Sequence, residues 1–155
     1  TRDQLVCHFL IVGYPLETLE GFLDENNLRS WCTLTGRIPY EELSGYLALA
    51  NVAIEPKMSD SGEASGKLLN YMAAGLPVVC YDSPNNNEIL ASGGFLADRS
   101  AGVSSLLLSL KQALSSPEEA QRRGKIARAR AEKSYSWDAA AAKVYAVYQE
   151  NTINN

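Results

Sequence analysis

Several residue types that build metal sites and disulfide frameworks are scarce in this sequence. Its 155 residues include one histidine and three cysteines, Cys7, Cys32 and Cys80. No cysteine pair has the spacing of a metal-ligand set, and an odd number of cysteines in apolar runs argues against a disulfide framework. We therefore expect no metal site, three buried free thiols and a reducing, cytoplasmic location.

Long apolar runs and an excess of one charge are also missing. No run is long enough to cross a bilayer, and no leader-type segment opens the sequence. The net charge of −4 does not favour nucleic acid or an anionic membrane as the main partner. The exception is a cluster of basic residues at 122–130, within a helical pattern. This cluster is either a solvated helix face or a patch for peripheral contact with anionic lipid.

What remains is an ordinary globular composition with strand and helix patterns that alternate. The length suits one domain with a sizeable core, so we expect a single domain over residues 1–155. Apolar runs predict strands at 5–12, 31–35, 52–55, 78–81 and 95–97, and helical periodicity predicts helices at 16–25, 40–50, 67–74, 88–91, 103–115, 117–133 and 137–150. The alternation predicts the α/β class, with a Rossmann-like parallel sheet flanked by helices on both faces. Ligands bind such sheets at the carboxyl ends of the strands.

The segment at residues 58–82 combines a polar loop, a helical pattern and a buried strand. The loop leads into the helix, which Gly75 and Pro77 end before the strand begins. Backbone N–H groups at a helix start, together with the helix dipole, favour a phosphate or another anion, and Lys67 adds a point charge. The loop matches neither the Walker sequence nor the dinucleotide fingerprint. Local chemistry therefore indicates a candidate anion site, with an ordinary surface loop as the alternative.

Four motifs of the sequence resemble those of one enzyme family. They are LIVG at residues 10–13, TGRIPYEEL at 35–43, KLLNYMAAGLPVV at 67–79 and SW at 136–137. In this order and spacing they resemble the C-terminal, donor-nucleotide domain of retaining family 4 glycosyltransferases (glycosyl transferases group 1). The resemblance covers nearly the whole chain and implies the C-terminal half of a GT-B fold. Because the family's N-terminal domain has no counterpart in this sequence, we expect a fragment of a longer enzyme.

The resemblance implies a transferase of the hexosyltransferase type. The parent enzyme would move a sugar from a nucleotide-diphosphate sugar, such as a UDP-sugar or a GDP-sugar, to a glycan, a lipid or a small molecule. It would retain the anomeric configuration and need neither a cofactor nor a metal ion. The donor would bind this domain and the acceptor mainly the N-terminal domain. Because both sides of the cleft are needed to exclude water, we expect the isolated domain to be inactive.

The resemblance also implies roles for individual residues around the diphosphate and the sugar. Lys67 would support the diphosphate, and Glu63 would approach the sugar hydroxyls, so these two are the expected catalytic residues. Backbone N–H groups of Ser65, Gly66, Lys67 and Leu68 would bind the diphosphate. Leu69, the next residue of the motif, is also counted among the expected donor-binding residues, although the side chains of Leu68 and Leu69 are more typical of the core.

The nucleoside end of the donor is expected to bind elsewhere on the domain. By the same resemblance, backbone groups of Gly36, Arg37 and Ile38 would lie beside the nucleobase, and Gly13 would lie near the sugar phosphates. Asn70 would face the ribose.

One departure from the family pattern bears on activity. The family has two glutamates separated by seven residues, and these positions fall on Gly62 and Asn70 here. The ribose-binding carboxylate is therefore an amide, which binds a hydroxyl as a neutral group. Two alternatives stay open for this reason: a non-catalytic nucleotide-binding or scaffold domain, and a nucleotide-sugar epimerase of the same overall fold.

Overall fold

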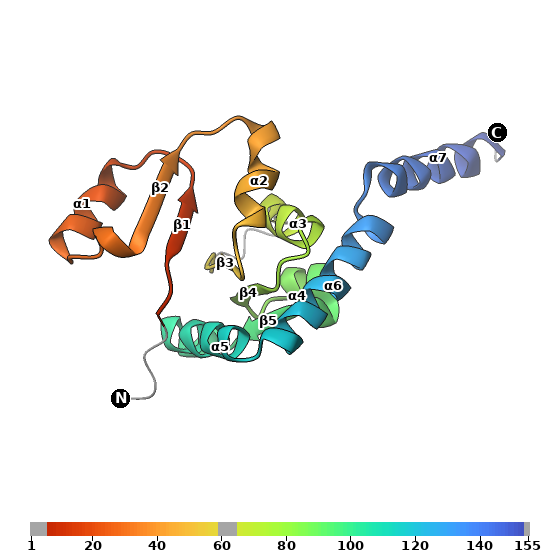
Figure 1. The fold of residues 1–155 in the computed structure, drawn as a ribbon. Coiled ribbons are helices and arrows are strands. Elements are labelled where there is room, and N and C mark those ends of the chain that lie inside the picture. Colours follow the sequence, from red (N-terminus) through yellow and green to blue (C-terminus); the bar gives the residue numbers. More distant parts are fainter. Residues whose placement is uncertain (1–5, 59–64, 154–155) are drawn as a thin grey trace. The chain divides into compact units, whose positions relative to one another are not determined.

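The computed structural model describes residues 6–58 and 65–153, and the chain divides into two compact units (Figure 1). The first unit comprises residues 1–50 and the second residues 51–155. Each unit is described on its own. Both contain parallel strands joined through helices, as the sequence predicts for the α/β class.

The first unit contains a two-stranded parallel sheet. Its elements are β1 (Phe9–Val12), α1 (Glu17–Glu25), the 3₁₀ turn η1 (Arg29–Trp31), β2 (Cys32–Gly36), the 3₁₀ turn η2 (Tyr40–Glu42) and α2 (Leu43–Ala48). The sequence predicts one helix over residues 40–50, and the structure instead has a 3₁₀ turn followed by a short α-helix. The Glu42 N–H donates to Pro39 O at 3.1 Å, an i to i+3 bond of the kind that defines a 3₁₀ turn.

The second unit is built on three parallel strands in the order β3–β4–β5. They are β3 (Ala53–Glu55), β4 (Val78–Tyr81) and β5 (Gly94–Ala97), so β3 and β5 are the edge strands of this sheet. The central strand β4 is buried along its whole length. Val78 and Cys80 lie in one core cluster and Val79 in another, because successive residues of a strand point to opposite faces. A strand that is buried on both faces explains why residues 78–81 read as a continuous apolar run.

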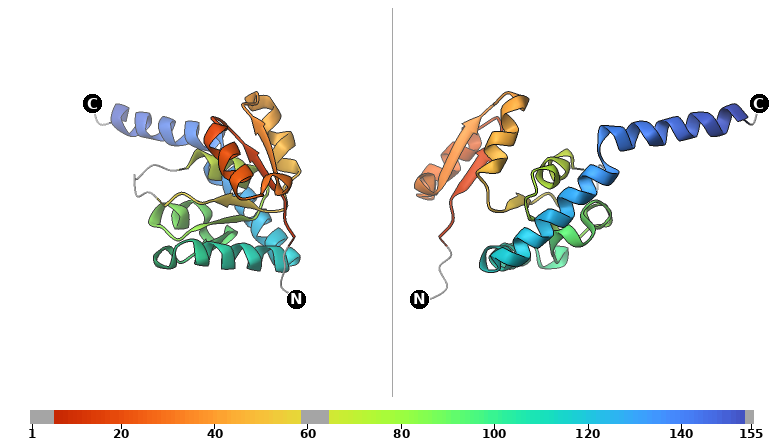
Figure 2. Two further views of the ribbon diagram at one scale, coloured as in Figure 1. Left: turned by 90° about the vertical axis from the view of Figure 1, so that its left-hand side faces the viewer. Right: turned by 45° about the vertical axis from the view of Figure 1, so that its right-hand side comes forward.

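Helices cover both faces of this sheet (Figure 1 and Figure 2). They are α3 (Gly66–Ala73), α4 (Pro84–Leu90), α5 (Val103–Ser115) and α6 (Pro117–Ser134), with 3₁₀ turns η3 (Ala91–Gly93) and η4 (Arg99–Ala101). Helix α7 (Trp137–Ile153) follows α6 and extends away from the sheet (Figure 1). Helices α3, α4 and α6 share one core cluster with β4, whereas α5 contributes to the cluster on the other face. The predicted fold class, a parallel α/β arrangement flanked by helices, is confirmed.

Two sequence-based details differ from the structure. Helix α4 begins at Pro84 rather than at residue 88, because the Ser83 hydroxyl accepts from the Asn86 N–H at 3.2 Å and Pro84 suits the first helical position. All three cysteines are free, as predicted, but only Cys80 is buried; Cys7 and Cys32 are half-buried.

Candidate functional site

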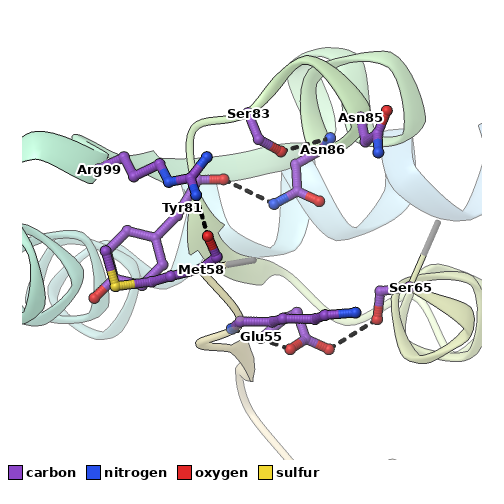
Figure 3. A pocket seen from close by; sticks show the side chains of 9 residues that line it. Glu55, Met58, Ser65, Tyr81, Ser83, Asn85, Asn86 and Arg99 are labelled. Atoms are coloured by element: carbon purple, nitrogen blue, oxygen red, sulfur yellow. Dashed lines mark hydrogen bonds between the residues drawn. The ribbon is translucent and has the colours of Figure 1, made fainter. Parts of the chain in front are cut away.

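A pocket lies where the three parallel strands of the second unit end (Figure 3). We call it the sheet-edge pocket; it is lined by Glu55, Lys57, Met58, Ser65, Tyr81, Ser83, Asn85, Asn86 and Arg99. These residues come from the carboxyl ends of β3 and β4, from the start of α3 and α4, and from η4 after β5. Polar groups therefore converge at the edge of the sheet where parallel α/β proteins bind ligands.

Glu55 is the last residue of β3 and makes three contacts there. Its side chain is almost fully buried, at 3% exposure. One carboxylate oxygen accepts from the Ser65 hydroxyl at 2.8 Å and lies 3.6 Å from the Lys67 ammonium. The other oxygen accepts from the Lys57 backbone N–H at 3.2 Å. A buried carboxylate thus joins the end of β3 to the start of α3.

The start of α3 carries the residues expected to bind the diphosphate. Ser65 occupies the N-cap position but makes no side-chain capping bond, since its hydroxyl donates to Glu55. Gly66 is exposed, and a Cβ added there would meet nothing within 4 Å, so a ligand can approach the backbone. The Lys67 side chain is 67% exposed. The structure therefore brings Ser65, Gly66 and Lys67 together at the pocket's edge of the sheet.

Leu68 does not match its expected backbone role. Its N–H donates to Ser65 O at 3.0 Å within the first turn of α3, so this hydrogen-bond donor is already occupied. Its side chain is fully buried, and Leu69 packs against the same core cluster, which agrees with the core role expected for both side chains. Asn70 is half-buried on α3. Gly62 and Glu63 lie outside the described residues.

The far side of the sheet-edge pocket is formed after β4 and β5 (Figure 3). The Asn86 side-chain amide donates to Tyr81 O at 2.8 Å. The Arg99 guanidinium donates to Met58 O, so it links the segment after β5 to the segment after β3. An arginine and side-chain amides therefore stand on the opposite side of the pocket from Glu55.

The Glu55 carboxylate also affects groups buried beneath the pocket. Burial raises the pKa of the Tyr71 hydroxyl, and the charge of Glu55 raises it further. Burial raises the pKa of the Cys80 thiol to about 12, with smaller contributions from the charges of Glu55 and Asp82. Both neighbours stay protonated at neutral pH, so they add no negative charge beneath the pocket.

A second pocket lies in the first unit, where β1 and β2 end. We call it the Tyr14 pocket; it is lined by Val12, Gly13, Tyr14, Gly36, Arg37, Ile38, Tyr40 and Leu43. All four residues expected around the nucleobase and the sugar phosphates are in this set. The Gly13 N–H donates to Gly36 O at 3.2 Å, and the Arg37 guanidinium lies 5.2 Å from the centre of the Tyr14 ring. The expected site residues thus form two groups, one in each unit.

The arginines of α6 are largely engaged within the protein. Arg123 contacts the Phe95 ring and donates to Gly94 O, whereas Arg130 donates to the backbone carbonyls of Glu88 and Ile89. Arg122 and Arg128 pair with glutamates one turn away on the same helix. These contacts give no support to the lipid-binding alternative for residues 122–130.

The sequence analysis missed Glu55 and Arg99. Glu55 is the last residue of a predicted strand, and a charged residue in that position could have indicated a site residue. Arg99 carries no comparable signal, because its link to Met58 depends on how β3, β4 and β5 pair.

Within residues 6–58 and 65–153, no group of three or more His, Cys, Asp or Glu is arranged to hold a metal ion. In the same ranges no helix combines the length and the apolar character that crossing a membrane requires.

The fold and the sheet-edge pocket place the chain among parallel α/β proteins that bind ligands beyond the carboxyl ends of their strands. The family described as Glycosyl transferases group 1 matches residues 2–130. The chain therefore belongs to the glycosyl transferases group 1 family, as its motifs predict.

Two solved structures share the fold of this chain, and a curated relative is similar to part of it. Sucrose-phosphate synthase from Thermosynechococcus elongatus is similar over 94% of this chain and 39% of that one, with a TM-score of 0.80 and 24% identity. WaaG, a glycosyltransferase involved in lipopolysaccharide biosynthesis, is similar over 81% of this chain and 34% of that one, with a TM-score of 0.64 and 20% identity. Spore coat protein SA from Bacillus subtilis (strain 168) is 30% identical over 82 residues, which are 52% of this chain and 22% of that protein.

The structural likeness establishes the fold, which matches that of GT-B glycosyltransferases. The chain spans 39% or less of each of these three proteins.

Proposed function

We propose that this chain binds the donor of a retaining glycosyltransferase that moves a sugar from a nucleotide-diphosphate sugar to an acceptor. The observation that carries the proposal is the start of α3, where Gly66 and Lys67 stand beside the sheet-edge pocket. A helix start carries about half a positive charge, and the Lys67 ammonium adds a full one. Family membership supports a sugar transfer as the reaction.

The chemical task of this site is to stabilise a leaving diphosphate. The bond between the sugar's anomeric carbon and the diphosphate oxygen breaks, the oxygen of the acceptor hydroxyl takes the diphosphate's place, and its proton passes to the departing diphosphate. Negative charge grows on the departing oxygen, and the N–H groups of Gly66 and Lys67 with the Lys67 ammonium bind it. These groups are proposed to supply the stabilisation without a metal ion, and the resemblance to family 4 supports retention of configuration.

The Tyr14 pocket is the proposed site of the nucleobase. Gly36, Arg37 and Ile38 line it, and their backbone groups read the edge of the base, while Gly13 lies next to the sugar phosphates. The donor is a UDP-sugar or a GDP-sugar with a hexose, and the acceptor is a glycan, a lipid or a small molecule. Glu63 and Asn70 are proposed to bind hydroxyls of the transferred sugar and of the ribose.

Other parts of the enzyme are proposed to complete the catalytic cleft. The acceptor binds a domain of the same chain that precedes this one, and the parent enzyme is cytoplasmic. The 155-residue chain alone is expected to bind the donor without turnover, because one wall of the cleft cannot exclude water.

The test is a titration of the isotope-labelled chain with UDP, GDP and the corresponding nucleosides, followed through backbone amide shifts. Diphosphates should shift the amides of residues 66–70, whereas the nucleosides should leave the amides of Gly66 and Lys67 unchanged. Lys67→Ala should weaken diphosphate binding about tenfold, the lower end for a hydrogen bond between charged groups, because the Lys67 side chain is exposed. It should leave nucleoside binding unchanged.

Lys111→Ala on α5 is the matched control, since this exposed lysine lies outside both pockets. An equal loss of diphosphate and nucleoside binding in Lys67→Ala refutes a phosphate role for Lys67. Unchanged amides at 66–70 with every nucleotide argue instead for the non-catalytic scaffold, the alternative that Asn70 in the glutamate position favours.

A further inference from the structure

We propose that Glu55 is a positioning residue of the donor site, which holds Lys67 and the start of α3 ready for the diphosphate. The inference rests on the proposed function. Glu55 makes its contacts with Ser65, Lys67 and the Lys57 backbone through both carboxylate oxygens. The family pattern supplies carboxylates at two other positions, which are occupied here by Gly62 and Asn70.

Burial of a carboxylate at this place calls for an explanation. Among the described residues, the buried polar side chains are Glu55, Ser105 and Ser109, and Glu55 is the charged one. Removing a carboxylate from water is unfavourable unless hydrogen bonds and a partner charge compensate, and an apolar residue in such a position is often as stable. The sheet does not need this charge, so its value lies in the groups that it holds.

The first group is the connection between β3 and α3. Lys57 follows the strand and Ser65 precedes the helix, and each donates to a different oxygen of the same carboxylate. One side chain therefore fixes both the point where the chain leaves the sheet and the point where it enters the helix.

The second group is the Ser65 hydroxyl, the natural cap of α3. A serine at the N-cap usually accepts a hydrogen bond from an N–H of the first turn. Here it donates to Glu55 and makes no capping bond. Because Glu55 draws the hydroxyl away, the N–H groups of Gly66 and Lys67 are left for an anionic ligand.

The third group is the Lys67 ammonium. Its separation from Glu55, 3.6 Å, suits an ion pair but exceeds the usual length of a hydrogen bond between charged groups. The carboxylate orients the ammonium beside the pocket while leaving its three donors for oxygen atoms of a ligand. The negative charge of Glu55 also repels a diphosphate, but its ion pair with Lys67 and its hydrogen bonds from Ser65 and Lys57 offset part of that charge. We therefore expect the loss of positioning to outweigh the loss of repulsion when Glu55 is neutralised.

A double-mutant cycle with inorganic pyrophosphate as the probe tests this role. The variants are Glu55→Gln, Lys67→Ala and the double variant, and binding is followed through amide shifts of residues 66–70. Glu55→Gln should weaken pyrophosphate binding about fivefold in the presence of Lys67, whereas in the Lys67→Ala background it should weaken binding by at most about twofold, the part that acts through Ser65. A residue that served only the stability of the fold would weaken binding in both backgrounds alike.

Two further variants guard against an effect of folding. Ser109→Ala removes a buried polar group on α5, outside the pocket, and should leave pyrophosphate binding unchanged. Ser65→Ala keeps the charge pair and removes one hydrogen bond of Glu55, and it should weaken binding about twofold. If Glu55→Gln unfolds, Ser65→Ala decides the question, and unchanged binding in it overturns the proposal.

The outcomes separate this inference from the proposed function. Tighter pyrophosphate binding in Glu55→Gln, by the same factor with and without Lys67, makes Glu55 a repelling charge and overturns the inference alone. Unchanged amides at 66–70 when pyrophosphate is added to the wild-type chain overturn both the proposed function and the inference.

Discussion

Gly124 offers a sharp test of how α6 packs on the second unit. This glycine faces the turn that joins α3 to β4. A Cβ at position 124 would lie 2.2 Å from Gly75 O, 3.1 Å from Gly75 C and 3.2 Å from Pro77 N. These atoms belong to the backbone, so no side-chain rotation relieves the overlap, and Gly124→Ala must displace either the helix or the turn.

The expected magnitude follows from two opposing effects. Overpacking a tight contact costs about 1–3 kcal/mol, and the contact with the backbone places this case at about 3 kcal/mol. Alanine in place of glycine within a helix returns about 1 kcal/mol. We therefore expect a net destabilisation of about 2 kcal/mol, which corresponds to a melting temperature roughly 8–16 °C lower for a domain of about a hundred residues.

The assay is thermal unfolding by circular dichroism, combined with hydrogen exchange of the β4 amides. Exchange there should accelerate, because the displaced turn leads directly into β4. Gly21→Ala on α1 is the control, since a Cβ at that position meets nothing within 4 Å, and it should raise stability by up to about 1 kcal/mol. If Gly124→Ala is as stable as the wild type and its β4 amides exchange at the same rate, the packing argument is wrong.

Two further predictions concern ionisable groups. Burial raises the pKa of Cys80 to about 12, so a thiol reagent at mildly alkaline pH should modify the half-buried Cys7 and Cys32 and spare Cys80 until the protein unfolds; rapid labelling of Cys80 in the native chain would contradict this. Hydrogen bonds from Arg122 and Arg123 lower the pKa of Glu119 to about 2. A carboxyl whose folded pKa is depressed adds stability above its unfolded pKa, about 4.3, and loses that contribution as the pH falls toward the folded value. Thermal unfolding between about pH 5 and about pH 2 should therefore show a smaller acid-induced loss for Glu119→Gln than for the wild type or the neighbouring control Glu118→Gln; identical pH profiles for the three proteins would count against it.

The sequence patterns located most strands and helices because local signals and the final structure agree. The run at residues 78–81 is apolar throughout since both faces of β4 are covered. The predicted and observed helix boundaries differ where residues at the start of a helix decide where it begins. Ser83 and Pro84 begin α4 four residues earlier than the helical pattern does, and η2 replaces the first turn of the helix expected over residues 40–50.

The candidate site was predictable in part. Gly66 and Lys67 could be identified because a loop before a helix is a local feature, and the TGRIPYEEL motif pointed to the residues of the Tyr14 pocket. The role of Glu55 could not be identified, because its contacts with Ser65 and Lys67 form only when β3 lies beside the start of α3. The family was predicted and is confirmed; the retaining mechanism and the donor stay predictions.

The sheet-edge pocket is lined by residues that are far apart in the sequence, among them Glu55, Asn86 and Arg99. These residues lie around one pocket only because β4 pairs with β3 on one side and with β5 on the other. A molecule held in this pocket would therefore lose its binding place as soon as either strand pair separated. By mass action its binding free energy would add to the free energy of unfolding of the whole three-stranded sheet. A melting temperature that rises with the concentration of this molecule would therefore show that the pocket is occupied, without an assay of enzymatic activity.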